Sequence, residues 1–116
     1  CTDEQEVQKY IEDKQCGFIA TNQFFVDLTS GLMTIVKPKE IKKIRADLPI
    51  LLLSGSHDPV GENGKGIYKV ADQLKQAGLK DVTVYLFEGM RHEIINERNK
   101  QQVYDVVTRW MNNEKI

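Results

Sequence analysis

The sequence is short of cysteine, of net charge and of long apolar runs, and each shortage excludes a class of protein. Cys1 and Cys16 are the only cysteines among 116 residues and form no CxxC or Cys/His cluster, which favours a reducing compartment. The 16 Lys and Arg residues nearly balance the 17 Asp and Glu residues, so no nucleic-acid partner is indicated. The longest apolar run, Ile50 to Leu53, is far too short to cross a bilayer. With no signal-peptide pattern, we expect a cytoplasmic protein without stable membrane insertion.

The spacing of apolar residues divides the chain at residue 48. Residues 1–47 read as helical and irregular, with one helix expected over 1–13 and a second beginning near Asn22. Residues 48–116 read as strand, helix, strand and helix, because continuous β-type runs at 49–54 and 82–87 flank a helical pattern at 67–77. This order predicts an α/β fold with two parallel strands, a right-handed crossover helix and a C-terminal helix.

Some local features predict where the helices begin and which faces they bury. Thr2 with Gln5, and Asn99 with Gln102, resemble capping boxes at the starts of the first and last helices. The last helix carries apolar residues at helical spacing, which predicts a core-facing stripe: Val103, Val106, Val107, Trp110 and Met111.

Two side chains of catalytic type follow the two predicted strands. Asp58 lies four residues after Ser54, and His92 lies five residues after Phe87. Functional groups of open α/β sheets gather beyond the carboxyl ends of strands, and neighbouring strands lie about 4.8 Å apart. The Asp carboxylate and the His imidazole are therefore expected within hydrogen-bond reach. Such a pair activates a nucleophile when the Asp holds one ring nitrogen and the other nitrogen takes a proton.

Each of the two residues also has a plainer interpretation. Asp58-Pro59 is good turn chemistry, and an isolated His is commonly structural. Their order along the chain, each just after a strand, favours a catalytic pair, because Asp precedes His in the α/β hydrolases. The HEIIN segment has Asn96 where the zinc motif HExxH needs its second His, so no metal is expected.

The segment SGSHDPVGENGKGIYKVADQLKQAGLKDVTVYLFEGMRHEIINE resembles the C-terminal part of α/β hydrolases of the lysophospholipase, monoglyceride-lipase and serine-aminopeptidase-like branch. The resemblance implies that Asp58, in an SGxxDPVG loop, is the triad acid and that His92, in a GxRHExxNE turn, is the triad base. The stretch DKQCGFIATNQFFVDL resembles the lid of the same group. Residues 1–47 are thus expected to be a helical lid, and residues 48–116 the C-terminal part of the hydrolase core.

The nucleophile of that family is missing from the sequence. None of the three serines, Ser30, Ser54 and Ser56, stands in a GxSxG elbow, and neither does Cys16. Since the chain also begins at Cys1 rather than Met, we expect a fragment of a serine hydrolase, inactive by itself, whose parent acts on small acyl or lipid-like esters without a cofactor. The alternative is a non-catalytic interaction module. A homo-oligomer, or association with the missing N-terminal half, is expected.

Overall fold

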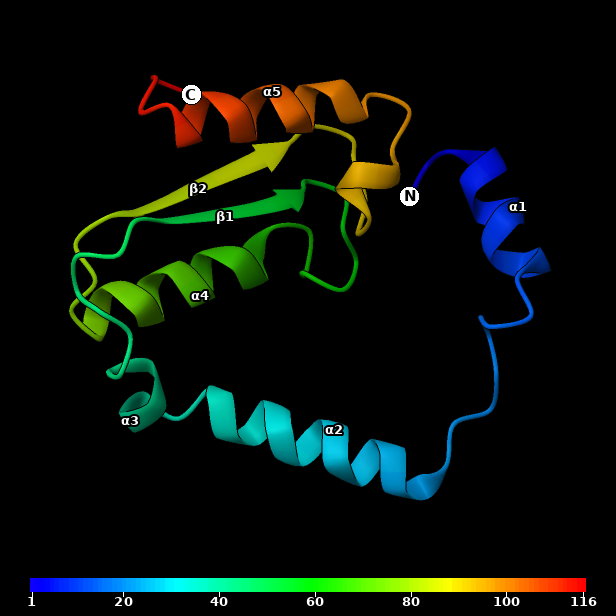
Figure 1. The fold of residues 1–116 in the computed structure, drawn as a ribbon, viewed down its shortest axis with the longest axis horizontal. Coiled ribbons are helices and arrows are strands. Elements are labelled where there is room, and N and C mark those ends of the chain that lie inside the picture. Colours follow the sequence, from blue (N-terminus) through cyan, green and yellow to red (C-terminus); the bar gives the residue numbers. More distant parts are fainter.

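The C-terminal part of the molecule is built on two parallel strands in a computed structural model that describes residues 1–116 (Figure 1). Strand β1 (Ile50–Gly55) is followed by helix α4 (Lys65–Gln76), strand β2 (Val82–Phe87) and helix α5 (Lys100–Met111). The strands are joined through the crossover helix as a parallel pair. The predicted α/β arrangement is therefore confirmed.

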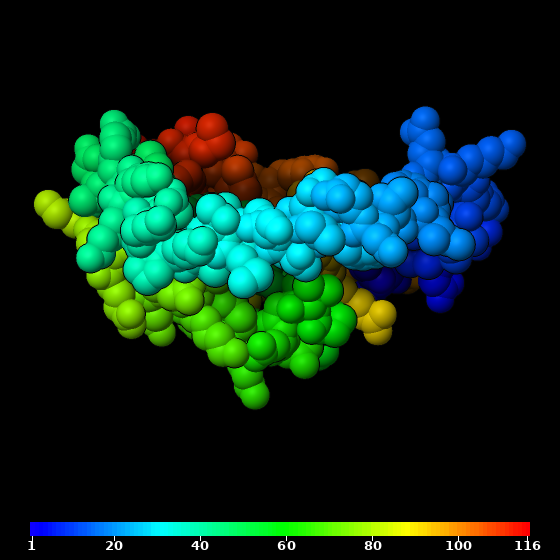
Figure 2. All heavy atoms as spheres, turned by 90° about the horizontal axis from the view of Figure 1, so that it is seen from below, coloured from blue at the N-terminus to red at the C-terminus, as the bar shows by residue number.

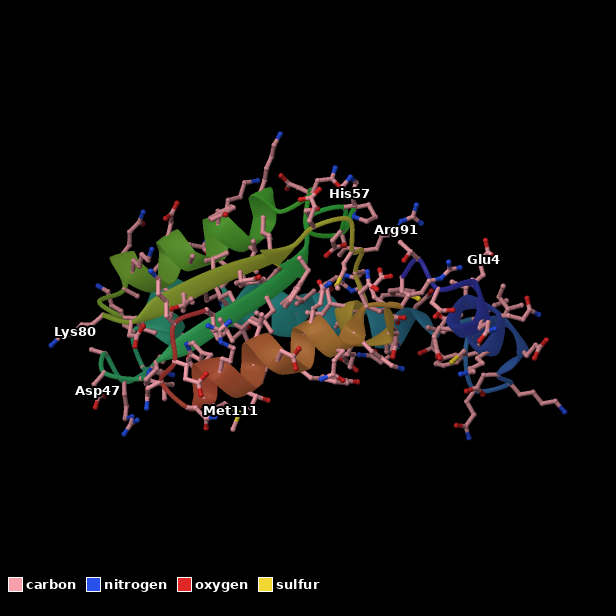
Figure 3. The ribbon with its side chains drawn as sticks, turned by 90° about the horizontal axis from the view of Figure 1, so that it is seen from above. Glu4, Asp47, His57, Lys80, Arg91 and Met111 are labelled. Atoms are coloured by element: carbon pink, nitrogen blue, oxygen red, sulfur yellow. The ribbon has the colours of Figure 1, made fainter.

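The register of the two strands brings their carboxyl ends level. Ile50 pairs with Val82 at one end, and Gly55 pairs with Phe87 at the other. Figure 3 shows His57 and Arg91, which follow the two strands, close together at this end, while Asp47 and Lys80 lie at the opposite end. The two loops that were predicted to carry functional side chains therefore leave the sheet side by side.

The two helices of the C-terminal part cover opposite faces of the strand pair, as Figures 1 and 3 show. On the α5 side, Phe87 and Met90 pack with Val103 and Val106 in a cluster of buried apolar residues. On the other side, α4 buries one apolar stripe. Met111 does not belong to the core as predicted, because α5 ends there and its side chain is 70% exposed.

The N-terminal part consists of helices that bury no side chain. These are α1 (Glu4–Glu12), α2 (Asn22–Ile35) and α3 (Pro38–Ile41). Figure 1 shows α1 and α2 set apart from the strands and joined to each other by a segment without helix or strand. A short 3₁₀ turn, η1 (Ile94–Asn96), connects β2 with α5.

Both predicted capping boxes are wrong. The N-cap of α1 is Asp3, whose carboxylate accepts the Gln5 N–H at 2.9 Å, because Thr2 turns its hydroxyl towards a distant residue. Asn99 stands at the N-cap of α5, but its side chain makes no capping bond. Side-chain capping depends on local backbone angles, and Asn99 has φ −95° and ψ 27° instead of the extended conformation that a capping residue adopts.

Helix α2 exposes an apolar surface that the rest of the chain leaves uncovered. Figure 2 shows it as a ridge across one face of the molecule. Its large apolar side chains are each about half exposed or more: Phe24, Phe25, Val26, Leu28, Leu32, Met33 and Ile35. No helix in the structure is both long enough and apolar enough to span a bilayer.

We expect the 116-residue chain to be ordered only as an oligomer. Its sheet has two strands, and each strand leaves its outer edge unpaired. Small sheets generally need three or more strands for independent stability, and bare edges invite pairing with another chain. Sedimentation or light scattering at micromolar concentration measures the oligomeric state directly. A cooperatively folding monomer would contradict the expectation.

Candidate functional site

The loop after β1 holds the Asp58 carboxylate in a fixed position. One carboxylate oxygen accepts the Val60 N–H at 2.9 Å, and the Asp58 carbonyl accepts the Asn63 N–H at 2.8 Å. Glu62, Asn63 and Gly64 all have positive φ, which turns the chain sharply into α4. The side chain of Asp58 is only 8% exposed and lies inside this turn.

Asp58 and His92 form a hydrogen-bonded pair across the ends of the two strands. The second carboxylate oxygen, Oδ2, lies 3.0 Å from the His92 Nδ1. The expected contact between the two side chains is therefore present. The imidazole is 59% exposed, so one side of the ring faces the buried carboxylate and much of the rest faces outward.

The electrostatics of the pair fix which ring nitrogen carries the proton. Burial alone would raise the pKa of the Asp58 carboxyl, but hydrogen bonds from His92 and from the backbone of Val60 and Gly61 outweigh it and leave this pKa below its ordinary value. Asp58 is thus ionised at neutral pH and only accepts hydrogen bonds. His92 must donate from Nδ1, so in the neutral ring Nε2 keeps its lone pair and can accept a proton.

Direct contacts join the loop of Asp58 to the loop of His92. The Ser56 N–H donates to the Phe87 carbonyl and the His57 N–H to the Met90 carbonyl, each at 2.9 Å. The Gly89 N–H donates to the Ser56 hydroxyl oxygen, also at 2.9 Å. These bonds continue the pairing of the strands beyond the sheet and hold the two loops as one unit.

Gly55 is the place where the two loops approach most closely. A Cβ atom added there would lie 2.1 Å from the Met90 carbonyl oxygen and 2.3 Å from the Arg91 carbonyl oxygen. Both neighbours are backbone atoms, which cannot move aside as a flexible side chain can. The absence of a side chain at Gly55 therefore lets the His92 loop lie directly on the end of β1.

The loop of His92 has a second anchor in Glu97, which is 2% exposed. Its Oε1 accepts the Arg91 N–H at 2.8 Å, and its Oε2 accepts both the N–H and the hydroxyl of Thr2. Burial would raise the pKa of the Glu97 carboxyl, but the hydrogen bonds from Thr2 and Arg91 outweigh it and lower this pKa.

The structure does not bring a nucleophile to His92. The three serines and Cys16 make other contacts or none, and the only side chain hydrogen-bonded to the His92 ring is Asp58. The Ser56 hydroxyl oxygen lies instead 2.9 Å from Nδ1 of His57, the adjacent and exposed residue. No group of three or more His, Cys, Asp or Glu residues is arranged to hold a metal ion.

Sequence reasoning did not identify the roles of Gly55, Ser56 and Glu97. A glycine directly after an apolar strand is a visible signal of close backbone approach. The positions of Ser56 and Glu97 depend on partners 33 and 95 residues away, and a local pattern gives no sign of such contacts.

Comparisons with known proteins agree with the fold. The profile of the family described as serine aminopeptidase, S33, matches residues 1–99. Among solved structures, a highly thermostable carboxyl esterase from Bacillus coagulans, in complex with glycerol, superposes with a TM-score of 0.80 at 28% identity. The superposition covers 96% of this chain and 36% of the esterase, so the chain spans about a third of the esterase's length. No curated protein matches the sequence.

Replacing Gly55 by Ala should destabilise the protein, because the new Cβ collides with two backbone carbonyls of the His92 loop. Overpacking of this kind costs about 1–3 kcal/mol of unfolding free energy or more. Urea unfolding measures the change. Gly31→Ala is the matched control, since nothing lies within 4 Å of the added Cβ and Ala favours the helical conformation. Equal stability of the Gly55 variant and wild type would show that the loops do not abut there.

Asp58→Asn should lower the free energy of unfolding more at neutral pH than in strong acid. The folded pKa of Asp58 lies below its unfolded value. Its ionised form therefore contributes stability that is fully present above the unfolded pKa and is lost as the pH falls through the folded pKa. Urea unfolding of both proteins across the acid range should show the two curves converging at low pH. A constant difference at every pH would mean that the Asp58 charge is not the stabilising element.

Proposed function

Because the chain belongs to the serine aminopeptidase (S33) family of α/β hydrolases, we propose that Asp58 and His92 are the acid and the base of a Ser-Asp-His triad. The observation that carries the proposal is the 3.0 Å contact between the buried, ionised carboxylate and the Nδ1 of an exposed imidazole. The position of the pair beyond the carboxyl ends of two parallel strands supports it further.

The geometry suits a defined sequence of proton transfers. His92 Nε2 takes the proton of a serine hydroxyl as its oxygen attacks the acyl carbon, and the Asp58 carboxylate stabilises the imidazolium that forms. The imidazolium then gives its proton to the leaving oxygen as the ester C–O bond breaks, so the alcohol departs and the acyl group stays on the serine. Water then attacks the acyl carbon and gives a proton to His92. As the bond to the serine oxygen breaks, His92 returns this proton to the serine and the carboxylic acid is released.

In this proposal the nucleophilic serine and the oxyanion-hole donors belong to a part of the hydrolase outside these 116 residues. The support is that no GxSxG elbow occurs in the sequence and that the chain spans 36% of the esterase it resembles. Association with that remaining part would also cover the outer strand edges.

The proposed substrate is a carboxylic ester, either a small acyl ester or a lysophospholipid-like ester. The structural neighbour supports this class, because it is a carboxyl esterase whose structure contains glycerol. We further propose that residues 1–47 form a lid over the acyl group, while residues 48–116 form the core. Helix α2, exposed and apolar, has the character of a surface that contacts acyl chains.

The 116-residue chain should not hydrolyse a p-nitrophenyl ester faster than its Asp58→Asn or His92→Ala variants. Without a nucleophile and an oxyanion hole, the pair has nothing to activate. Initial rates at equal protein concentration test this expectation. Activity that His92→Ala abolishes would mean that Ser56 or Cys16 acts as an unrecognised nucleophile.

In a complete hydrolase that contains this segment, Asp58→Asn should lower kcat about 10⁴-fold, and His92→Ala by at least as much. His57→Ala is the matched control, because this second exposed histidine contacts only Ser56 through its ring and should retain most of the activity. Full activity of the His92 variant would exclude the triad. It would instead favour a non-catalytic role for this segment.

A further inference from the structure

Glu97 is a buried carboxylate that the proposed chemistry does not use. With Asp58 it is one of the two charged residues that the fold buries, and it is the more deeply buried of the two. Carboxylates are rarely buried unless each oxygen is satisfied, and here all the partners are protein donors. These partners come from the start of the chain and from the loop of His92.

One arm of Glu97 completes a clamp on a single peptide group. The carbonyl oxygen of Met90 accepts the His57 N–H at 2.9 Å, and the N–H of Arg91 donates to Glu97 Oε1 at 2.8 Å. That oxygen and that N–H belong to the same planar peptide unit. The unit is thus held from one side by the neighbour of Asp58 and from the other by Glu97. This peptide unit joins Met90 to Arg91, and Arg91 directly precedes His92.

The other arm of Glu97 reaches the segment that precedes α1. The Thr2 N–H donates to Oε2 at 2.8 Å, and the Thr2 hydroxyl donates to the same oxygen. Thr2 of this segment, Glu4 at the start of α1 and Arg91 of the His92 loop line one hollow on the surface. In Figure 3 the labelled Glu4 and Arg91 lie towards the same end of the molecule, although they are far apart in the sequence.

We propose that Glu97 is a positioning residue that latches the segment before α1 to the loop of His92, so that the Asp58–His92 contact depends on an intact N-terminal segment. The inference rests on the proposed function in one respect, namely that His92 is the base. The latch makes the geometry of the base sensitive to whether the helical N-terminal part is in place.

The chemistry of the contact requires a carboxylate at position 97. Donors approach both oxygens, so the group must accept on both sides and cannot donate on either. The lowered pKa of Glu97 agrees with a charged form at neutral pH. A Gln side chain of the same shape has one acceptor oxygen in place of two, so its NH₂ group must face either the Arg91 N–H or the Thr2 N–H. Glu97→Gln therefore weakens one of the two arms.

Proton NMR of the chain tests the latch without any need for activity. The Nδ1 proton that His92 donates to Asp58 gives a resonance far downfield, and its exchange with water reports how often the contact opens. In Glu97→Ala we expect this exchange to be about tenfold faster, or the resonance to be lost, because a charge-assisted anchor is removed. Glu97→Gln should lie between Glu97→Ala and wild type.

Glu93→Ala is the matched control for the same loop. Glu93 is closer to His92 in sequence, yet it is exposed and its carboxylate hydrogen-bonds only the Asn96 side chain, so the exchange should stay at its wild-type rate. Unchanged exchange in a folded Glu97→Ala protein overturns the proposal. If that variant does not fold, Thr2→Val decides, since it removes only the hydroxyl donor. Faster exchange at equal global stability supports the latch, and unchanged exchange overturns it.

The failure of the latch and the failure of the triad are distinguishable. If the resonance responds to Glu97 while the complete hydrolase retains activity in His92→Ala, the latch stands and the triad fails. If the resonance does not respond while His92→Ala abolishes activity, the triad stands and the latch fails.

Discussion

Strands β1 and β2 end at the same position along the sheet, and the candidate site depends on this constraint. Gly55 pairs with Phe87 at the last position of the sheet, and the backbone bonds from Ser56 and His57 extend this pairing into the loops. Parallel strands have a fixed spacing, so loops that leave them at the same level place their side chains within reach. A register shift of one residue would move every side chain of β2 to the other face of the sheet and carry the His92 loop away from Asp58.

The two members of the pair, Asp58 and His92, differ in how deeply they are buried. The Asp58 side chain is 8% exposed, and the donors around it keep it ionised, while His92 is 59% exposed and presents its second nitrogen outward. A charge that is buried among fixed donors orients its partner without needing to move. An exposed imidazole remains accessible to another group. This division agrees with the roles of acid and base proposed for the two residues.

The two parts of the chain differ in how much of their apolar surface they bury. The C-terminal part packs Phe87, Met90, Val103 and Val106 into a closed cluster. The helices of the N-terminal part bury no side chain, and α2 leaves its apolar residues exposed. Glu97 is notable in this context, because its carboxylate joins Thr2 to the loop of His92 and so connects the two parts by polar contacts.

The sequence by itself determined the strand, helix, strand and helix order from residue 48 onward and placed Asp58 and His92 after neighbouring strands. Apolar runs and helical spacing are local signals, and parallel pairing follows from the crossover helix. Only the tertiary structure decided that Thr2 binds Glu97 instead of capping α1, that Met111 is exposed, and that Gly55 lies against the loop of His92. Each of these facts depends on contacts between residues far apart in the sequence, or on where a helix ends relative to its neighbours. A local sequence pattern contains neither kind of information.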